Sequence, residues 1–266
     1  MNFLITGATG TVGNILVNNL SQKQENIVVL MRNPNKMAFS GNVTKVQGDL
    51  SNAFAWKDSL KEIDGLFLLL TPDGDPAIIQ YAAEANVKHI VALSDGTRYP
   101  TEEALYQSKL NWTMLFPVEF MKNTLIFWQE SIRTQHIART PFPDAKGALI
   151  HEADIAEVAE VVLCNAGHEK KSYYLTGAEI STPRLRIQSI AEAIHRPVQM
   201  VIQTEEEARA EYAGLGFSDA LIDYAIESNK HPEPYMYTVL PTVLELTGHP
   251  ARSFEQWARE HATDFI

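Results

Sequence analysis

The sequence predicts an α/β protein with a doubly wound parallel sheet and a smaller C-terminal α/β lobe. Short apolar runs alternate with helical patterns through the first half of the chain, which is typical of parallel strands joined by crossover helices. A glycine-rich turn separates the first apolar run from the first helical pattern. At 266 residues and 45% hydrophobic content, the chain is long enough to bury the core of such a domain.

The first half supplies the strands of the predicted sheet and the helices between them. Asp75 and Pro76 indicate a helix cap and a proline at the first helical position, ahead of an apolar helical face. In a doubly wound sheet the ligand crevice lies outside the carboxyl ends of the strands, here near the first and the fourth. The strands are expected at residues 3–6, 27–31, 45–47, 66–70, 89–94 and 112–116.

The glycine-rich turn has the spacing GxxGxxG. Gly7 permits a tight turn off the first strand, Gly10 lets the backbone approach a phosphate, and Gly13 lets the helix pack closely on the sheet. The helix that follows points its free amide groups and the positive end of its dipole at the anion. The motif predicts a dinucleotide, and the alternative is a glycine-rich turn of another α/β protein. The expected binding residues are Gly7, Thr9, Gly10, Thr11, Val12 and Gly13.

Beyond Pro117 the alternation of strands and helices fades. Residues 140–143 indicate a loop, 154–164 an amphipathic helix, and 172–176 a strand that returns to the sheet. Capping-box spacing at Thr204 and Ser253 predicts the starts of two later helices. We expect residues 1–117, with a returning strand near 171–177, to form the nucleotide-binding domain. Residues 118–266 are expected to form a substrate-binding lobe.

Several segments resemble a known family. The GxxGxxG spacing resembles short-chain dehydrogenase/reductases, and residues 103–123, 154–156 and 246–250 are similar to the NmrA-like atypical members. Two residues depart from that pattern, since Lys109 replaces a usual glycine and Phe116 a usual arginine. The resemblance implies a Rossmann domain that binds NAD(P). It further implies either reductase activity on quinones, dyes or similar acceptors, or redox sensing without turnover.

The end of the second strand decides between NAD and NADP. An acidic residue there accepts from the free ribose hydroxyl of NAD, whereas a basic residue pairs with the 2'-phosphate of NADP. Residues 26–48 contain no Asp or Glu but include Arg32, Lys36 and Lys45. A guanidinium forks onto phosphate oxygens, so we expect NADP rather than NAD, with Arg32 at the phosphate. The alternative is that these are ordinary surface cations and that NAD is bound.

The resemblance also assigns residues to the adenosine part of the cofactor. It implies that Asp49, after the third strand, accepts a hydrogen bond from the adenine amino group. A turn-forming aspartate fits the local sequence nearly as well. On the same resemblance, the adenine and ribose walls are lined by Leu50, Leu70 and Thr71.

The proton-transfer pair Tyr-x-x-x-Lys of most superfamily members is missing, because no tyrosine has a lysine four residues later. Tyr106 and Lys109 come close in spacing, but they directly precede the sixth strand and so belong to the amino edge of the sheet. Ser94 leaves the fifth strand at the carboxyl edge and is the candidate catalytic residue, although a structural turn fits it equally well. Core packing is the alternative for the aromatic members of the candidate substrate pocket. That pocket comprises Ser94, Tyr99, Phe116 and Phe120.

Composition narrows the class of partner. A net charge of -11 argues against nucleic acid and anionic membrane surfaces. The apolar runs are too short to span a bilayer and no secretory signal precedes the first strand, so a cytoplasmic location is expected. The single cysteine, Cys164, excludes an intramolecular disulfide, and the histidines lack metal-ligand spacing, so no metal site is expected. A small-molecule acceptor is the expected partner, and the oligomeric state is open.

Two functions remain. The first is an NADPH-dependent reductase that transfers hydride to a quinone-like or other conjugated acceptor. Because such an acceptor delocalises the developing anion and solvent can supply the proton, positioning does most of the catalysis. The second is a non-catalytic NADP(H)-binding redox sensor, which needs the same cofactor site. A sugar epimerase or alcohol dehydrogenase is disfavoured, since each requires the missing proton shuttle.

Overall fold

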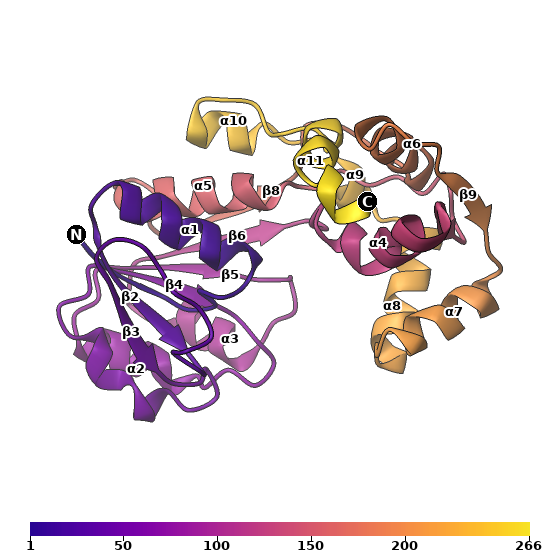
Figure 1. Ribbon diagram of the computed structural model, residues 1–266. Helices are drawn as coiled ribbons and strands as arrows, with labels where there is room; N and C mark the ends of the chain where they lie inside the picture. Colours follow the sequence, from indigo (N-terminus) through magenta and orange to yellow (C-terminus); the bar gives the residue numbers. More distant parts are fainter. The chain divides into compact units, whose positions relative to one another are not determined.

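A computed structural model describes all 266 residues, which divide into two compact units. Unit 1 comprises residues 1–117, 152–175 and 242–248. Unit 2 comprises residues 118–151, 176–241 and 249–266. The chain therefore passes between the units several times, as the colour sequence in Figure 1 shows.

Unit 1 is built on a seven-stranded sheet with the order β3-β2-β1-β4-β5-β6-β8, and every neighbouring pair of strands is parallel. The order reverses between β1 and β4, which is the topological switch point of a doubly wound sheet. This arrangement confirms the predicted fold class. The strands are β1 (Asn2–Ile5), β2 (Asn26–Met31), β3 (Val43–Gln47), β4 (Gly65–Leu69), β5 (His89–Leu93), β6 (Trp112–Pro117) and β8 (Lys171–Leu175).

The observed strands lie within one or two residues of the expected ends. β5 is buried along its whole length, as expected for a central parallel strand covered on both faces. The edge strand β3 is mostly exposed, so its first residues carry little apolar signal and the prediction began two residues late. Ser94, expected as the last residue of the fifth strand, instead lies just past the carboxyl end of β5.

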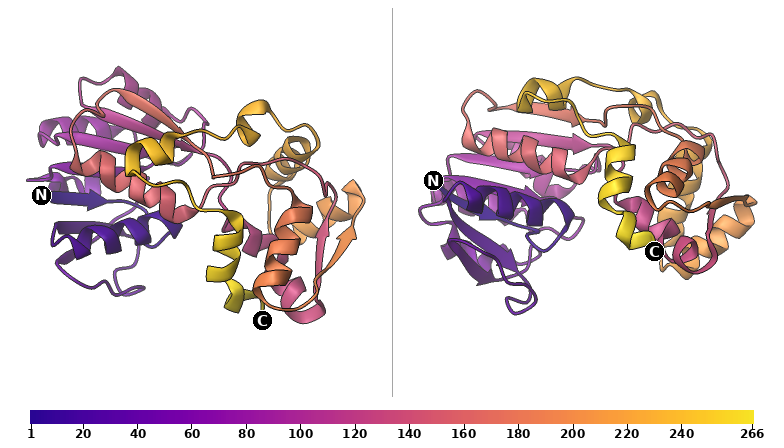
Figure 2. Two further views of the ribbon diagram at one scale, coloured as in Figure 1. Left: turned by 90° about the horizontal axis from the view of Figure 1, so that it is seen from above. Right: turned by 45° about the horizontal axis from the view of Figure 1, so that its top comes forward.

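Helices cover both faces of this sheet. Figures 1 and 2 show α1 (Thr11–Gln22) beside α5 (Glu152–Cys164) on one face, and Figure 1 shows α2 (Ala77–Glu84) and α3 (Pro100–Gln107) on the other. α10 (Thr242–Thr247) packs against α5, and η1 (Ala53–Ala55) and η2 (Lys57–Leu60) pack against α2. Asp75 accepts a hydrogen bond from the Ala77 amide (3.0 Å), so it caps α2 as expected, with Pro76 at the cap position rather than inside the helix.

The helix α5 corrects the expected division of the chain. Its apolar face, with Ile155, Val158, Ala159 and Val162 fully buried, packs in unit 1 against α1 and the sheet. Residues 152–175 and 242–248 therefore join the first unit, although they lie beyond residue 118. The reason is that the parallel sheet must be covered on both faces, and α5 supplies part of that cover. Cys164 at the end of α5 is half-buried, and burial raises the pKa of its thiol.

Unit 2 is mainly helical. Its main core contains Trp128, Ile190, Phe254 and Trp257, and a smaller apolar cluster joins α7 (Glu205–Gly214) to α8 (Asp219–Lys230). Its strands β7 (Ile137–Thr140) and β9 (Gln199–Ile202) form a two-stranded parallel sheet, so the loop expected at 140–143 begins only after Thr140. Its helices are α4 (Asn123–Gln135), α6 (Pro183–Ala193), α7 (Glu205–Gly214), α8 (Asp219–Lys230), α9 (Pro234–Tyr237), α11 (Phe254–Glu260) and η3 (Ala262–Phe265).

Two helix starts in unit 2 follow the sequence prediction. Thr204 and Glu207 form the reciprocal capping box at α7, with the Glu207 amide donating to the Thr204 hydroxyl and the Thr204 amide donating to the Glu207 carboxylate. Ser253 accepts from the Gln256 amide (3.2 Å) and so caps α11. Short-range capping signals were therefore sufficient to find both helices.

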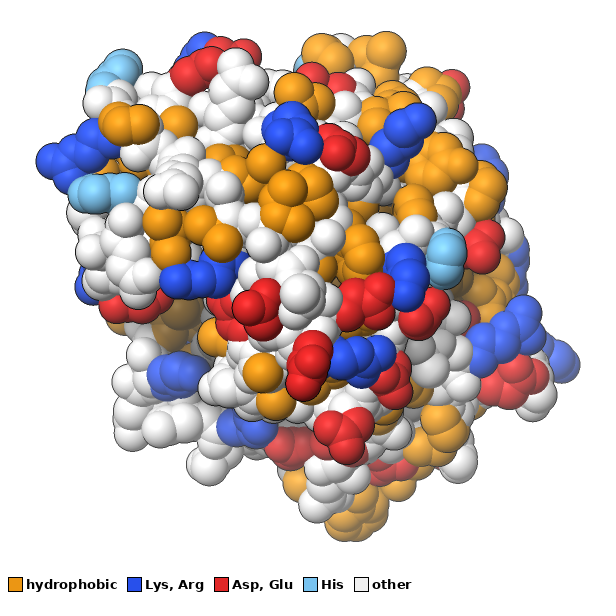
Figure 3. Space-filling model, turned by 90° about the vertical axis from the view of Figure 1, so that its right-hand side faces the viewer, with side chains coloured by type: hydrophobic (Ala, Val, Ile, Leu, Met, Phe, Trp, Pro, Cys, Tyr) orange, Lys and Arg blue, Asp and Glu red, His pale blue; other side chains and the backbone are white.

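The surface carries charges of both signs. On the face drawn in Figure 3, acidic and basic side chains are interspersed with hydrophobic ones. Large exposed apolar side chains of unit 2 include Leu215, Leu221 and Tyr224. None of the helices combines the length and the apolar composition required to cross a bilayer.

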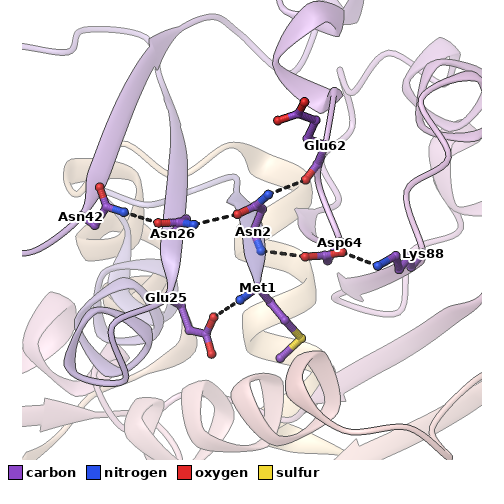
Figure 4. A network of polar contacts seen from close by, with 8 residues as sticks. All are labelled: Met1, Asn2, Glu25, Asn26, Asn42, Glu62, Asp64 and Lys88. Atoms are coloured by element: carbon purple, nitrogen blue, oxygen red, sulfur yellow. Dashed lines mark hydrogen bonds and ion pairs between the residues drawn. The ribbon is translucent and has the colours of Figure 1, made fainter.

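The amino ends of the strands are joined by polar side chains, shown in Figure 4. Asn42 donates to Asn26, Asn26 donates to Asn2 (2.9 Å), and Asn2 donates to the Glu62 carbonyl (2.8 Å). The Asn2 amide and Lys88 both donate to Asp64, at 2.8 and 2.6 Å. Polar contacts between side chains and backbone thus link the starts of neighbouring strands at this edge of the sheet.

Candidate functional site

The glycine turn lies at the carboxyl end of β1, beside the switch point. Gly7 has a φ of +64°, a left-handed conformation that glycine adopts without strain, and its carbonyl accepts from the Gly10 amide (2.8 Å). A Cβ at position 10 would lie 3.1 Å from the Gly7 carbonyl oxygen, and a Cβ at position 13 only 2.3 Å from it. Gly13 therefore permits the start of α1 to pack against the turn itself.

Thr6 fixes this turn to the neighbouring strand. The residue is fully buried, and its hydroxyl donates to the Phe67 carbonyl (3.0 Å) and accepts from the Leu69 amide (2.8 Å). Because β4 lies across the switch point from β1, these bonds set the spacing of the two strands below the turn. The sequence analysis missed this role; the only signal was a hydroxyl residue between an apolar strand and a glycine.

The first turn of α1 has no protein partner for its amide groups. α1 begins at Thr11 with Gly10 at its cap position, no side chain caps it, and no acidic residue lies in its first turn. Thr9 and Gly10 are exposed, while Val12 and Gly13 are buried. A 12-residue helix that presents uncapped amides and its positive dipole end is suited to an anion.

Arg32 follows β2 and is exposed, and its guanidinium makes no hydrogen bond or ion pair. Lys45 is different, because its ammonium donates to the carbonyls of Pro34 (3.0 Å) and Met37 (2.7 Å) and so holds the loop after β2. Of the cations in the acid-free segment, Lys45 therefore has a structural role. Arg32 is left available for a second anion.

Asp49 forms a turn after β3. One carboxylate oxygen accepts from both the Ser51 amide (2.9 Å) and the Ser51 hydroxyl (2.7 Å), which is the arrangement of a turn-forming aspartate. These bonds lower the pKa of Asp49, and the nearby Arg32 lowers it further. The other carboxylate oxygen has no hydrogen bond, so the turn leaves one acceptor available.

Leu50, Leu70 and Thr71 lie near the same edge. Leu50 is half-buried against the core, and Leu70 is 5% exposed. The Thr71 hydroxyl is buried and has no hydrogen-bond partner. Since buried polar groups in folded proteins are nearly always hydrogen-bonded, this hydroxyl after β4 keeps an unused hydrogen-bonding capacity.

Ser94 is tied to a residue that the sequence analysis did not identify. Its side chain is 2% exposed, and its hydroxyl donates to the Glu102 carboxylate (2.9 Å) and accepts from the Gly96 amide (3.1 Å). Glu102, in the first turn of α3, is equally buried. The Ser94 proton is therefore committed to Glu102, and the turn with Gly96 is formed. An acidic residue in a first helical turn is so common that Glu102 gave no distinct signal.

The other candidate pocket residues divide between the units. The Tyr99 hydroxyl donates to Asp95 (2.7 Å), and burial, with that bond, raises the pKa of Tyr99. Phe116 stacks on Tyr174 with ring centres 5.2 Å apart. Ser94, Tyr99 and Phe116 belong to unit 1, whereas Phe120 belongs to unit 2.

Tyr106 and Lys109 take structural positions. The Tyr106 ring packs edge-on against Trp112, the first residue of β6, with centres 4.9 Å apart. Lys109 is exposed beyond the end of α3. Both residues thus lie toward the amino end of β6, at the edge opposite the glycine turn.

Known proteins resemble this chain over the region that contains the glycine turn. A family model described as NAD(P)H-binding matches residues 7–101. The chain is 31% identical to the (4-alkanoyl-5-oxo-2,5-dihydrofuran-3-yl)methyl phosphate reductase of Streptomyces griseus, with 98% of both chains covered. It is also 31% identical to the NAD(P)H azoreductase of Xenophilus azovorans, again with 98% of both covered.

A solved structure has the same fold. The NADPH-dependent quinone oxidoreductase of Escherichia coli, determined in complex with NADPH, superposes with a TM-score of 0.82 at 24% identity. The match covers 97% of this chain and 99% of that one. The similarity extends through both units.

Proposed function

The chain belongs to the NmrA-like atypical short-chain dehydrogenase/reductases, a family of NAD(P)H-dependent oxidoreductases, and on this premise we propose that it reduces a quinone-like or other conjugated acceptor with NADPH. The observation that carries the proposal is the pairing of the uncapped α1 terminus with an unpartnered Arg32. The helix terminus offers a binding position for a pyrophosphate, and Arg32 offers one for a further phosphate.

The residues present fit NADPH. The pyrophosphate would lie against the amides of residues 10–12, where Gly10 carries no side chain. Arg32 would pair with the 2'-phosphate, and the free oxygen of Asp49 would accept from the adenine amino group. The Thr71 hydroxyl would gain the partner that it lacks in the protein alone.

The acceptor class is supported by what the relatives reduce. Their names specify an azo compound, a quinone and a 5-oxo-2,5-dihydrofuran, which are all unsaturated, electron-poor groups. When bound, NADPH supplies a hydride; the acceptor gains that hydride and one proton while NADP⁺ is formed. Because the Ser94 hydroxyl donates to Glu102 and the Tyr99 hydroxyl donates to Asp95, we assign the proton to solvent.

Turnover decides between the reductase and a redox sensor. The loss of NADPH absorbance should be followed with a panel of quinones, azo dyes and aldehydes. We expect turnover with quinones or azo dyes and none with simple aldehydes, which need a proton donor. Tight NADPH binding without turnover of any acceptor would contradict the reductase and favour the sensor.

Arg32 is proposed to make the protein prefer NADPH over NADH. Replacing Arg32 with serine removes the charge-assisted bonds to a 2'-phosphate and should raise the Kd for NADPH by about 10- to 100-fold, with little change for NADH. Lys61→Ser removes the same charge from an exposed position of unit 1 and serves as the control. Tighter binding of NADH than NADPH by the unaltered protein would overturn the assignment.

A further inference from the structure

Glu102 is a buried carboxylate of unit 1 that forms no ion pair. It lies in the first turn of α3 and is only 2% exposed. It accepts a hydrogen bond from the Ser94 hydroxyl at 2.9 Å, and no basic side chain pairs with it. Such a group is uncommon, because a buried carboxylate loses its hydration and is normally compensated by a cation.

The next residue along the chain shows the common arrangement. Glu103 lies in the same helical turn, but it is exposed and accepts from the side-chain amide of Gln107 at 2.7 Å. Water hydrates the charge of Glu103, whereas the fold excludes water from Glu102. The two residues therefore carry the same charge at neighbouring positions, and the field of the buried one is screened far less.

Dipoles rather than a cation support negative charge at Glu102. The positive end of the α3 dipole favours an acidic residue in the first turn, and the Ser94 hydroxyl donates to the carboxylate. Arg98, in the loop before α3, lies over the Tyr106 ring instead, with its guanidinium carbon 5.9 Å from the ring centre. No full positive charge therefore cancels the charge of this carboxylate.

Glu102 lies at the carboxyl edge of the second half of the sheet. Ser94 directly follows β5, and the Thr101 hydroxyl donates to the Gly74 carbonyl (2.9 Å) in the loop after β4. The start of α3 is thus linked to the loops that follow both strands. A doubly wound sheet binds one half of a dinucleotide on each of its halves. Since the proposed adenosine contacts follow β2 and β3, the nicotinamide is expected over the half that contains Glu102.

We propose that Glu102 makes the protein bind the oxidised cofactor more tightly than it otherwise would, and so makes bound NADPH a better hydride donor. The nicotinamide ring is neutral in NADPH and carries a positive charge in NADP⁺, after hydride has left with both bonding electrons. A carboxylate shielded from water attracts that charge and has little effect on the neutral ring. The inference rests on the proposed function and names the residue that sets the preference between the two forms of its cofactor.

Separate titrations with NADP⁺ and NADPH measure this preference without turnover. The unaltered protein, Glu102→Gln and the control Glu103→Gln are titrated with each form by calorimetry. Both substitutions remove one negative charge and keep the shape of the side chain. In Glu102→Gln the ratio of the Kd for NADP⁺ to the Kd for NADPH should rise by about 3- to 30-fold. In Glu103→Gln the ratio should change by less than about twofold, because water screens that charge.

The ratio separates an electrostatic role from a structural one. A structural role would weaken both cofactor forms equally in Glu102→Gln, and an unchanged ratio would therefore overturn the inference. An equal rise in Glu103→Gln would overturn it as well. If no acceptor is reduced, the reductase proposal fails while the ratio still decides this inference. If the protein prefers NADH, the ratio is measured with NAD⁺ and NADH, which carry the same nicotinamide ring.

Further variants separate charge from packing. Glu102→Asp keeps the charge and loses one methylene, so the ratio should rise less than in Glu102→Gln. The double variant Ser94→Ala/Glu102→Met replaces both partners of the buried hydrogen bond with apolar groups and covers the case in which Glu102→Gln does not fold. It should show the full rise, whereas Ser94→Ala alone, which keeps the carboxylate, should not. A double variant with the ratio of the unaltered protein would contradict the proposed role.

Discussion

Gly13 and Gly214 are both helical glycines, but the space around their Cα atoms differs. A Cβ at position 13 would lie 2.3 Å from the Gly7 carbonyl oxygen, whereas one at position 214 would meet nothing within 4 Å. Gly13→Ala should therefore lower the free energy of unfolding by about 1–3 kcal/mol, because backbone must shift. Gly214→Ala should be neutral or stabilising by up to about 1 kcal/mol. Urea denaturation of the two variants checks this, and equal effects would contradict the close packing at Gly13.

Ser94 tests whether a buried hydroxyl is structural or catalytic. Its bond to Glu102 stabilises a buried carboxylate, so Ser94→Ala should lower the free energy of unfolding by about 1–2 kcal/mol. Because its proton is committed, kcat for a quinone should stay within about threefold of the unaltered value. Denaturation and steady-state kinetics on the same variant give both numbers. A large fall in kcat with an unchanged free energy of unfolding would indicate that Ser94 is catalytic rather than structural.

At the scale of elements, the contact between β5 and β6 predicts a dependence on pH. The Thr113 hydroxyl donates to the His168 carbonyl (2.6 Å), so at the 2.9 Å contact with His89 the ring Nε2 is the donor. Burial lowers the pKa of His89 below its usual value of 6.5. A folded-state pKa below the unfolded one means that His89 favours folding above pH 6.5 and that this contribution is lost as the pH falls from there.

The free energy of unfolding should therefore decrease between pH 7.5 and pH 5. In His89→Gln the decrease should be smaller, because the titrating group is gone. His231→Gln, which alters an exposed histidine of unit 2, should keep the dependence of the unaltered protein. Urea denaturation across this pH range gives the change of the free energy of unfolding with pH for each variant. An identical pH dependence in both variants would show that His89 does not cause the decrease.

For the whole molecule, cofactor binding and stability should be coupled. NADPH at about 100 times its Kd adds about 2.7 kcal/mol to the stability of a form that binds it. For a chain of this size each kcal/mol corresponds to about 2–4 °C, so Tm should rise by roughly 5–10 °C. Gly10→Val places a Cβ 3.1 Å from the Gly7 carbonyl oxygen and a branched side chain in the proposed path of the phosphate, so the increase in Tm on adding NADPH should vanish. A Gly10→Val protein that keeps the full NADPH increment would argue against the turn as the phosphate seat.

The sequence alone determined the strands, the switch-point turn, the capped helices and the family. These features depend on local periods and on short motifs, and the chain geometry converts such patterns directly into strands, helix starts and glycine conformations. The acid-free segment around Arg32 could likewise be recognised from the sequence, because it is defined only by the absence of Asp and Glu over a short stretch.

Only the tertiary structure decided which partners those residues receive. In the folded chain, α5 packs in the first unit and the Ser94 hydroxyl donates to Glu102. Lys45 donates to the carbonyls of the loop after β2. The tertiary structure also buries Arg186 against Trp128, while Arg184 pairs with Asp144. Each outcome depends on which groups meet across the fold, and hydration, burial and hydrogen bonding act on those neighbours rather than on the order of residues along the chain.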